Sequence, residues 1–352
     1  ECTTAHDVTT QLQILDLLKS ISKTKKISII VITHNLAVVS YICSRVYVMF
    51  EGKTIESSIS KNLFTNPQHD YTKKLLNSSK QIENSDFYSN HEVNKILNIE
   101  NLSKNFKLPG TKKPLKAVND LSFSLKEGEI FGIAGESGSG KTTVANLLMG
   151  LLELNSGKIT FIDKEINSYL KNERKNFRKN IQMVFQDPYG SLNPRKTIGN
   201  TLSLALKIHF NLEETELKNK VFELLEKVEL TPPEVFYDRH PHELSGGQQQ
   251  RVAIARAIST EPKLIISDEA VASLDMSIRS EILKLLKKIN ADTKVSMIMI
   301  SHDLSVLKNM CNRIAIMHLG KIVEIGDKKE IFSSPQHDYT KKLISATLEI
   351  PN

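Results

Sequence analysis

Residues 135 to 143 read Gly135-Glu136-Ser137-Gly138-Ser139-Gly140-Lys141-Thr142-Thr143, which matches the pattern G-x-x-x-x-G-K-[ST]. The apolar run 129–134 before it predicts a buried parallel strand, and residues 143–150 after it predict a helix closed by a glycine. Glycines let successive backbone N–H groups wrap an anion, and the helix N-terminus adds a favourable dipole. Lys141 can reach the β- and γ-phosphates, and the Thr142 hydroxyl can ligate Mg²⁺. A plain glycine-rich connection is the alternative, but the complete pattern predicts a nucleotide site in an α/β fold.

The bulk composition is that of a globular protein of about two domains, at 352 residues with 40% apolar and 25% charged residues. The formal charge of +7 raises the question of a nucleic-acid partner. Its lysines are scattered, so we predict none, and we interpret the run 171–179 as a solvated helix face rather than a phosphate site. The three cysteines are widely spaced and offer no metal framework. No apolar stretch approaches the ~20 residues that span a bilayer.

An internal repeat organises the chain. Residues 32–36 (Ile-Thr-His-Asn-Leu) recur as Ile-Ser-His-Asp-Leu at 300–304, and 67–75 (Pro-Gln-His-Asp-Tyr-Thr-Lys-Lys-Leu) recur unchanged at 335–343. Both pairs share an offset of 268 residues. We therefore predict that residues 1–79 are the C-terminal fragment of a first domain, truncated at its N-terminus. Residues 80–94 are a polar linker, and 95–352 are a complete second copy.

Two segments upstream of the phosphate loop, 96–102 and 121–125, alternate apolar and polar residues. This alternation predicts half-buried antiparallel strands. Phe106 lies between them and has two interpretations: its ring stacks on adenine, or it is a core residue at the end of a loop.

A predicted strand over 181–185 ends at Gln186, whose amide can bind a metal-bound water or the γ-phosphate. Helical periodicity then begins, and we expect a helical region over about 187–258. It contains Leu244-Ser245-Gly246-Gly247-Gln248, placed before a helix expected over 252–258. Ser245 to Gln248 are a second candidate anion site at a helix N-terminus. The alternative is an N-cap serine with glycines for the turn.

A buried strand over 263–269 delivers Asp268 and Glu269 at its C-terminal end, the edge where ligands bind in open parallel sheets. Asp268 suits a water-mediated Mg²⁺ contact, and Glu269 suits polarising the attacking water. A further strand over 295–300 ends before His302, which can contact the γ-phosphate. A lone histidine is more often structural, but this one shares the edge with both acids. The predicted catalytic residues are Glu269, His302 and Gln186, and the predicted metal residues are Thr142, Gln186 and Asp268.

The order of these motifs closely resembles the nucleotide-binding subunit of ATP-binding cassette transporters. The resemblance covers essentially 95–352 and identifies Gln186 with the Q-loop, 244–248 with the signature, 273–275 with the D-loop and His302 with the switch histidine. It implies a P-loop NTPase cassette with a mixed sheet, an antiparallel β subdomain and a helical signature subdomain, preceded by the fragment of another cassette. ATP and Mg²⁺ are the implied cofactors. Nucleotide contacts are implied for the phosphate loop, Phe106, Asp275 and Ser245 to Gln248, the last on a partner cassette.

The resemblance is narrowed to the oligopeptide/dipeptide/nickel importers by residues 185–195 and 239–244. The presence of two copies in one chain resembles the tandem ATPases of peptide, microcin C or glutathione import. The implied function is ATP hydrolysis that energises import of peptides or related small solutes. The implied location is peripheral, on the cytoplasmic face of the inner membrane. The implied partners are integral membrane permease subunits, a second nucleotide-binding domain and, indirectly, an extracytoplasmic solute-binding protein. Ala270 departs from the family, which usually has proline there.

Two other functions remain open on the sequence. A soluble cassette acting on ribosomes or DNA is expected to carry a long charged linker or a coiled coil, and neither is present. A non-functional remnant of an interrupted tandem gene is the other. Because the apolar stretch 27–32 lacks the central strands it would pair with, we predict that the first-copy segment is poorly ordered or aggregation-prone.

Overall fold

The structure, a computed structural model, describes residues 7–80, 94–107, 109–110, 113–348 and 350. Glu1, Cys2 and most of the predicted linker therefore lie outside the described residues. Among those described, no helix combines the length and the apolarity that crossing a membrane requires.

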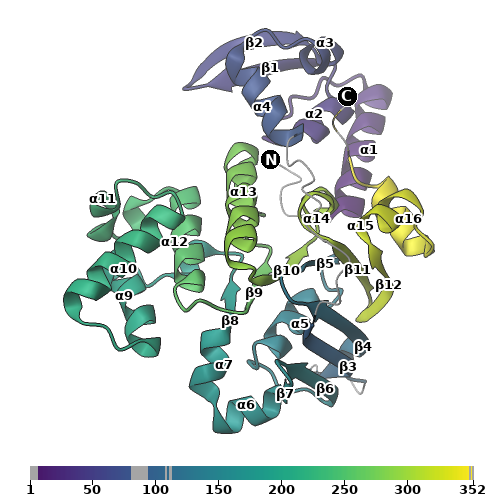
Figure 1. The fold of residues 1–352 in the computed structure, drawn as a ribbon. Coiled ribbons are helices and arrows are strands. Elements are labelled where there is room, and N and C mark those ends of the chain that lie inside the picture. Colours follow the sequence, from purple (N-terminus) through teal and green to yellow (C-terminus); the bar gives the residue numbers. More distant parts are fainter. Residues whose placement is uncertain (1–6, 81–93, 108, 111–112, 349, 351–352) are drawn as a thin grey trace.

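A six-stranded mixed sheet carries the phosphate loop, in the order β12-β11-β5-β10-β9-β8 (Figure 1). Neighbouring strands are parallel except for the antiparallel pair β11 and β12. Every residue of β5, β9 and β10 is buried, as expected where both faces of a parallel sheet are covered. The strands are β5 (Ile130–Ala134), β8 (Ile181–Val184), β9 (Leu264–Asp268), β10 (Ser296–Ser301), β11 (Arg313–His318) and β12 (Lys321–Asp327). The predicted strands at 129–134, 181–185, 263–269 and 295–300 are confirmed.

A four-stranded antiparallel sheet lies beside it, in the order β4-β3-β6-β7. Its strands are β3 (Lys95–Phe106), β4 (Leu115–Lys126), β6 (Ser156–Phe161) and β7 (Lys164–Glu165). Leu102 pairs with Leu121 between β3 and β4, which confirms the predicted antiparallel strands and extends them. Phe106 is the last residue of β3 and pairs with Leu115, so the expectation that it lies in a loop between the strands is wrong.

Helix α5 (Lys141–Leu148) begins two residues before the predicted start and takes Lys141 and Thr142 into its first turn. Helix α6 (Ile166–Asn172) packs against β6 and β7 of the antiparallel sheet, and α7 (Arg174–Asn180) packs against α6 and against β8 of the large sheet. The region predicted to be helical contains α8 (Pro188–Ser191), α9 (Ile198–His209), α10 (Glu214–Lys227), α11 (Pro233–Tyr237), the 3₁₀ turn η1 (Pro241–Glu243) and α12 (Gly246–Ile258). Helices α9 to α12 lie to one side of the large sheet in Figure 1. Helix α12 begins at Gly246 rather than at 252, because Ser245 caps it and the two glycines form its first turn.

The first-copy segment repeats the elements of the second copy at the same offset. It contains α1 (Val8–Lys25), α2 (Leu36–Ile42), β1 (Arg45–Phe50), β2 (Lys53–Ile59), α3 (Ser60–Thr65) and α4 (Asp70–Lys80). Their counterparts are α13 (Met276–Thr293), α14 (Leu304–Met310), β11, β12, α15 (Lys328–Ser333) and α16 (Asp338–Ser345). Helix α4 reaches Lys80, one residue into the predicted linker.

The apolar stretch 27–32 forms no strand, so the expectation of a strand there is wrong. Ile30 is 90% exposed and Ile32 is 76% exposed. Its second-copy counterpart, β10, lies between β5 and β9 and receives backbone hydrogen bonds from both. Among the described residues, β1 pairs with β2 alone. A strand without a neighbouring strand leaves its backbone groups to water, which is why the same pattern stays irregular here.

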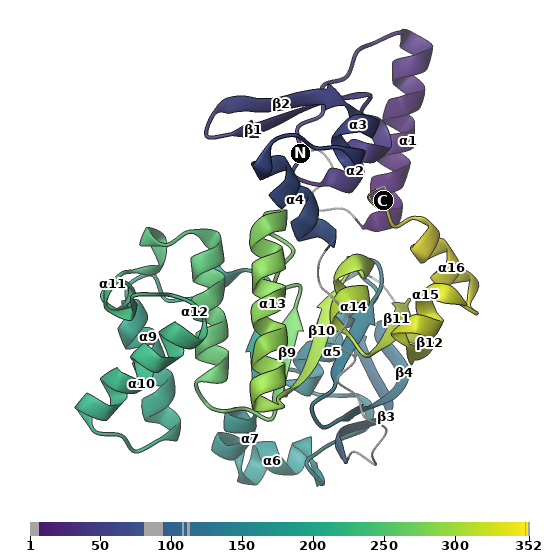
Figure 2. The ribbon, with the colours of Figure 1, turned by 45° about the horizontal axis from the view of Figure 1, so that its top comes forward.

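The first copy rests on the second through two helices. Helix α4 packs against α13 (Figure 2). Asp7, directly before α1, accepts a hydrogen bond from Ser137 of the phosphate loop. A small apolar cluster holds the first copy together and includes Leu36, Leu63, Phe64 and Leu76. Met276, at the start of α13, packs against this cluster. The two copies therefore share apolar contacts.

Candidate active site

Two glycines of the phosphate loop, Gly135 and Gly140, lie where no side chain fits. Gly140 has φ +104°, and a Cβ there would lie 2.1 Å from the carbonyl oxygen of Ala117. A Cβ on Gly135 would lie 2.3 Å from the carbonyl oxygen of Met317. Helix α5 starts directly after Gly140, so its first N–H groups point into the loop. The geometry is that of an anion cradle.

Lys141 lies inside this cradle, with only 6% of its surface exposed. Its Nζ donates to the carbonyl oxygens of Gly135 at 2.7 Å and Glu136 at 2.8 Å. Burial lowers the pKa of the Lys141 ammonium, and the nearby Glu269 carboxylate opposes that shift. The side chain is thus a positive charge held at the loop by its own backbone, within reach of a phosphate in the cradle.

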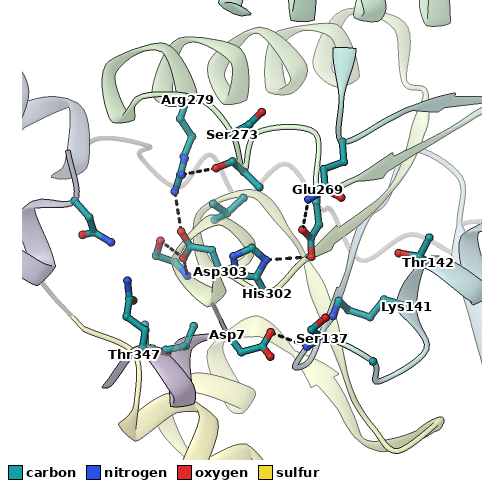
Figure 3. Close-up of a pocket in the computed structure, with 18 of the residues that line it drawn as sticks. Asp7, Ser137, Lys141, Thr142, Glu269, Ser273, Arg279, His302, Asp303 and Thr347 are labelled. Carbon is teal, nitrogen blue, oxygen red and sulfur yellow. Dashed lines mark hydrogen bonds and ion pairs between the residues drawn. The ribbon is translucent and has the colours of Figure 1, made fainter. Parts of the chain in front are cut away.

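Three predicted catalytic residues meet at the C-terminal edge of the sheet. Gln186 follows β8, and its side-chain amide donates to Glu269 Oε2 at 3.0 Å. His302 follows β10, and its Nδ1 lies 3.0 Å from Glu269 Oε1 (Figure 3). Glu269 itself follows β9 with a φ of +47°, a left-handed backbone conformation uncommon for glutamate. Because β8, β9 and β10 are adjacent and parallel, their ends bring the three side chains together.

The contact between His302 and Glu269 shifts both pKa values. The hydrogen bond that the Glu269 carboxylate accepts from His302 raises the pKa of His302 and lowers the pKa of Glu269. The carboxylate therefore stays ionised to a lower pH than a free glutamate, while the imidazole holds its proton to a higher pH than a free histidine.

Asp268 and Thr142 offer oxygen ligands beside this group. Burial raises the pKa of Asp268, and a hydrogen bond from Thr142 opposes the shift. Asp268 Oδ1 is buried and has no hydrogen-bond partner among the described atoms. Within the described part of the chain, no three His, Cys, Asp or Glu side chains cluster closely enough to hold a metal. The oxygens fit a Mg²⁺ ion that takes its other ligands from phosphate and water.

A cavity of about 1310 Å³ opens over this edge. The predicted site residues that line it are Phe106, Ser137, Gly138, Gly140, Lys141, Thr142, Thr143, Gln186, Glu269 and His302. Phe106 is half-buried there, and the Lys104 ammonium lies 5.5 Å from its ring centroid. The phosphate loop, the catalytic candidates and two of the magnesium candidates, Thr142 and Gln186, therefore face one space, whereas Asp268 does not line it.

The predicted signature residues, and Asp275 of the predicted D-loop, lie elsewhere. Ser245, Gly246, Gly247, Gln248 and Asp275 do not line the cavity. Ser245 and Gln248 form a reciprocal capping box, in which Gln248 N–H donates to Ser245 Oγ at 3.3 Å and Ser245 N–H donates to Gln248 Oε1 at 3.0 Å. The cap that the alternative interpretation describes is thus present, and Ser245 and Gly246 are exposed at the start of α12.

Sequence reasoning missed several residues near the site. Asp7 of the first copy accepts the N–H of Ser137 at 2.6 Å, and Thr9 donates to the Glu136 carboxylate (Figure 3 shows Asp7 and Ser137). Arg279 pairs with Asp303, next to His302, at 3.0 Å. No short-range pattern announces these pairs, because their partners lie far apart in the chain. Tyr339, which contacts the phosphate loop, lies in the repeated segment at 335–343, and that repeat was an available signal.

Solved structures of known proteins share this fold. A structure of the ATP-binding cassette MJ0796, described as dimeric and bound to ADP and Pi, is 30% identical with a TM-score of 0.60; the match covers 66% of this chain and 98% of that one. A structure of cbiO1 from Clostridium perfringens is 31% identical with a TM-score of 0.61, over 68% of this chain and 91% of that one. The chain belongs to the ATP-binding cassette family. Its cassette has the expected P-loop α/β fold with a mixed sheet and an antiparallel β subdomain.

Family models and curated relatives refine the assignment. The model described as ABC transporter matches residues 118–272, and the one described as oligopeptide/dipeptide transporter, C-terminal region, matches 55–104 and 323–352. The C-terminal region of the cassette therefore resembles that of oligopeptide/dipeptide transporters. Glutathione import ATP-binding protein GsiA is 39% identical in Escherichia coli O157:H7 and 38% in strain K12, over 98% of this chain. The chain spans 60% of the length of these relatives.

Proposed function

We propose that this chain is an ATP-hydrolysing subunit that energises the import of peptides or related small solutes across the cytoplasmic membrane. The observation that carries the proposal is the convergence of the phosphate loop with Gln186, Glu269 and His302 on one edge of the sheet. The resemblance of the C-terminal region to oligopeptide/dipeptide transporters supports the solute class. Glutathione, which the names of the relatives contain, is one peptide of that class.

In the proposed reaction, the loop amides and Lys141 bind the phosphates of ATP. Thr142 and Asp268, with Gln186 through water, would hold Mg²⁺, whose charge neutralises the phosphates. Glu269 orients a water and accepts its proton as the water oxygen bonds to the γ-phosphorus and the bond to ADP breaks. His302 now occupies one oxygen of Glu269. We propose that His302 turns toward the γ-phosphate and frees that oxygen.

The partners follow from the position of the signature. Because Ser245 to Gln248 lie outside the cavity, we propose that they and Asp275 complete a nucleotide site on a second nucleotide-binding domain. The exposed start of α12 supports this, since the N-terminus of a helix favours an anion. The remaining proposed partners are permease subunits and, indirectly, a solute-binding protein. The proposed location is the cytoplasmic face of the inner membrane, bound peripherally.

We also propose a tandem arrangement, in which 1–79 belong to a first cassette, 80–94 are a linker and 95–352 are the second cassette with a helical subdomain at about 187–258. The element-by-element match between the copies supports it. The edge of β1 also supports it. In the second copy the equivalent strand, β11, pairs with β5. An equivalent strand of a first cassette would cover that edge and the exposed isoleucines of 27–32.

Substitution of Glu269 tests the catalytic assignment. We expect Glu269→Gln to bind ATP within about twofold of the wild type and to release phosphate at least ~10²-fold more slowly, because the amide cannot accept a proton. Isothermal titration and a phosphate-release assay measure the two quantities. The exposed Glu214→Gln is the matched control. Unchanged turnover in Glu269→Gln would refute the base.

The transport role needs a separate test in cells. Deletion of the gene should abolish uptake of a labelled dipeptide, tripeptide or glutathione, and the wild-type gene should restore it. A gene carrying Lys141→Ala should not restore uptake, because the phosphate loop loses its buried cation. Normal uptake of all three solutes in the deletion strain would contradict the proposed import of peptides.

A further inference from the structure

The repeated segment at 67–75 and 335–343 has no role in the function proposed above. In the second copy it starts helix α16 and is anchored by hydrogen bonds. The Glu324 carboxylate of β12 accepts the N–H groups of Gln336 at 2.8 Å and His337 at 3.0 Å. His337 Nδ1 in turn accepts the N–H of Tyr339 at 3.1 Å, which caps the helix. The hydrogen bonds of Glu324 and His337 therefore fix where the Tyr339 side chain projects from the first turn of α16.

The Tyr339 ring lies on the strand that borders the phosphate loop. It stacks on the His318 ring with centroids 3.9 Å apart and an interplanar angle of 27°. His318 follows Met317, whose carbonyl oxygen packs so closely on Gly135 that no side chain fits between them. The ring is thus fixed relative to the start of the loop.

The Tyr339 hydroxyl reaches Glu136, the first variable residue of the loop. It accepts the Glu136 N–H at 3.3 Å. Burial raises the pKa of the phenol to about 12, so the hydroxyl keeps its proton at physiological pH. That proton also allows it to donate to the Glu136 carboxylate. One hydroxyl therefore holds both the backbone and the side chain of the same loop residue.

The first copy has the same scaffold with a different target. Glu56 accepts the N–H groups of Gln68 at 2.8 Å and His69 at 3.0 Å, and His69 Nδ1 accepts the N–H of Tyr71 at 3.1 Å. The Tyr71 ring packs against Phe50, with centroids 4.4 Å apart. The same hydrogen bonds thus position a tyrosine in both copies, and in the second copy that tyrosine contacts the phosphate loop.

We propose that Tyr339 is a positioning residue of the phosphate loop: its hydroxyl holds Glu136 so that the loop amides keep the geometry that binds nucleotide. The role rests on the proposed function, because it takes the loop to bind ATP. It links the C-terminal region that matches oligopeptide/dipeptide transporters to the nucleotide site. The ring and the hydroxyl have separate tasks, since the stack on His318 needs no hydroxyl.

Tyr339→Phe removes the hydroxyl and keeps the ring, and Tyr71→Phe is the matched control in the other copy. Both are made in the full chain. Two quantities are measured: ATP affinity by isothermal titration, and amide exchange over 135–139 without nucleotide. We expect Tyr339→Phe to weaken ATP binding about three- to tenfold and to speed exchange of the loop amides by a similar factor, as for loss of one partly buried hydrogen bond. Tyr71→Phe should leave both within about twofold.

The outcomes separate this role from the proposed function. ATP binding by the wild type with unchanged affinity in Tyr339→Phe would overturn the positioning role alone. Equal weakening in both variants would overturn it as well, because the effect would not depend on the loop contact. A wild-type chain that binds no ATP would overturn the proposed function together with this role.

Discussion

The contact between His302 and Glu269 links protonation to folding. The pKa of His302 is raised and that of Glu269 is lowered, each mainly by the hydrogen bond to the other. The histidine contribution is complete below its unfolded value of 6.5 and is lost as pH rises through the raised value. The glutamate contribution is complete above 4.5 and is lost as pH falls through the lowered value. The pair therefore stabilises the fold most between pH 4.5 and 6.5.

His302→Gln should cost stability in a pH-dependent way. We expect the loss in unfolding free energy, measured in urea, to be about 1 kcal/mol larger at pH 6 than at pH 9, because the imidazolium is neutralised at high pH. His209→Gln is the control of opposite sign, since burial lowers the pKa of His209 and the wild type loses stability as pH falls. A pH-independent cost for His302→Gln would contradict the ion pair.

At the scale of the element, one apolar pattern adopts two structures. Residues 27–32 are irregular and exposed, whereas their counterpart β10 is a buried central strand. Ile298 lies between Phe131 of β5 and Ile266 of β9, and it is fully buried. Its counterpart Ile30 is 90% exposed. Pattern and propensity are shared, so the neighbouring strands decide whether a strand forms.

A pair of equivalent substitutions measures this difference. Ile298→Ala should lower the unfolding free energy by ~2–5 kcal/mol, because it leaves a cavity in a packed core. Ile30→Ala should change it by less than about 0.5 kcal/mol, because the side chain is in water. Denaturant titration of both variants gives the two values. A similar cost at both positions would show that 27–32 pairs in solution with a strand that buries it.

At the scale of the whole molecule, helix α1 connects the copies at the phosphate loop. Thr9 is 8% exposed and donates its hydroxyl to the Glu136 carboxylate. Asp7 accepts the N–H of Ser137 at 2.6 Å, and the sheet β1-β2 lies at the far end of the first copy. Because the Tyr339 hydroxyl also contacts Glu136, this loop residue joins the first copy to the C-terminal region. A movement of Glu136 on nucleotide binding would therefore alter contacts to both the first copy and the C-terminal region.

Thr9→Val should loosen the first copy without unfolding the cassette. We expect amide exchange in α1 to accelerate about fivefold, as for loss of ~1 kcal/mol, while exchange in β5 and β9 stays unchanged. Mass spectrometry of exchanged peptides measures both. Thr24→Val, at the other end of α1, is the control, since its hydroxyl donates to the carbonyl oxygen of Ser20 in the same helix. Equal acceleration in both variants would contradict a role for the contact with Glu136.

Much of the candidate site could be predicted because its determinants are local. The glycines and Lys141 specify the loop, and each catalytic candidate follows a recognisable strand. Parallel strands end on one edge, so Gln186, Glu269 and His302 were expected to converge, and they do. The helix boundary at Gly246 was missed because a cap depends on side-chain geometry that periodicity does not show.

The amino-acid sequence alone determined the phosphate loop, the duplicated order of elements and the edge on which the site forms, because short-range patterns encode all three. Tertiary structure decided what depends on distant partners. Ile298 became core and Ile30 stayed in water, although both lie in the same pattern. Tyr339 met Glu136 and Tyr71 met Phe50, although both lie in the same nine residues. Hydrogen bonds and burial depend on the residues that a segment contacts, and a repeated segment does not specify those residues.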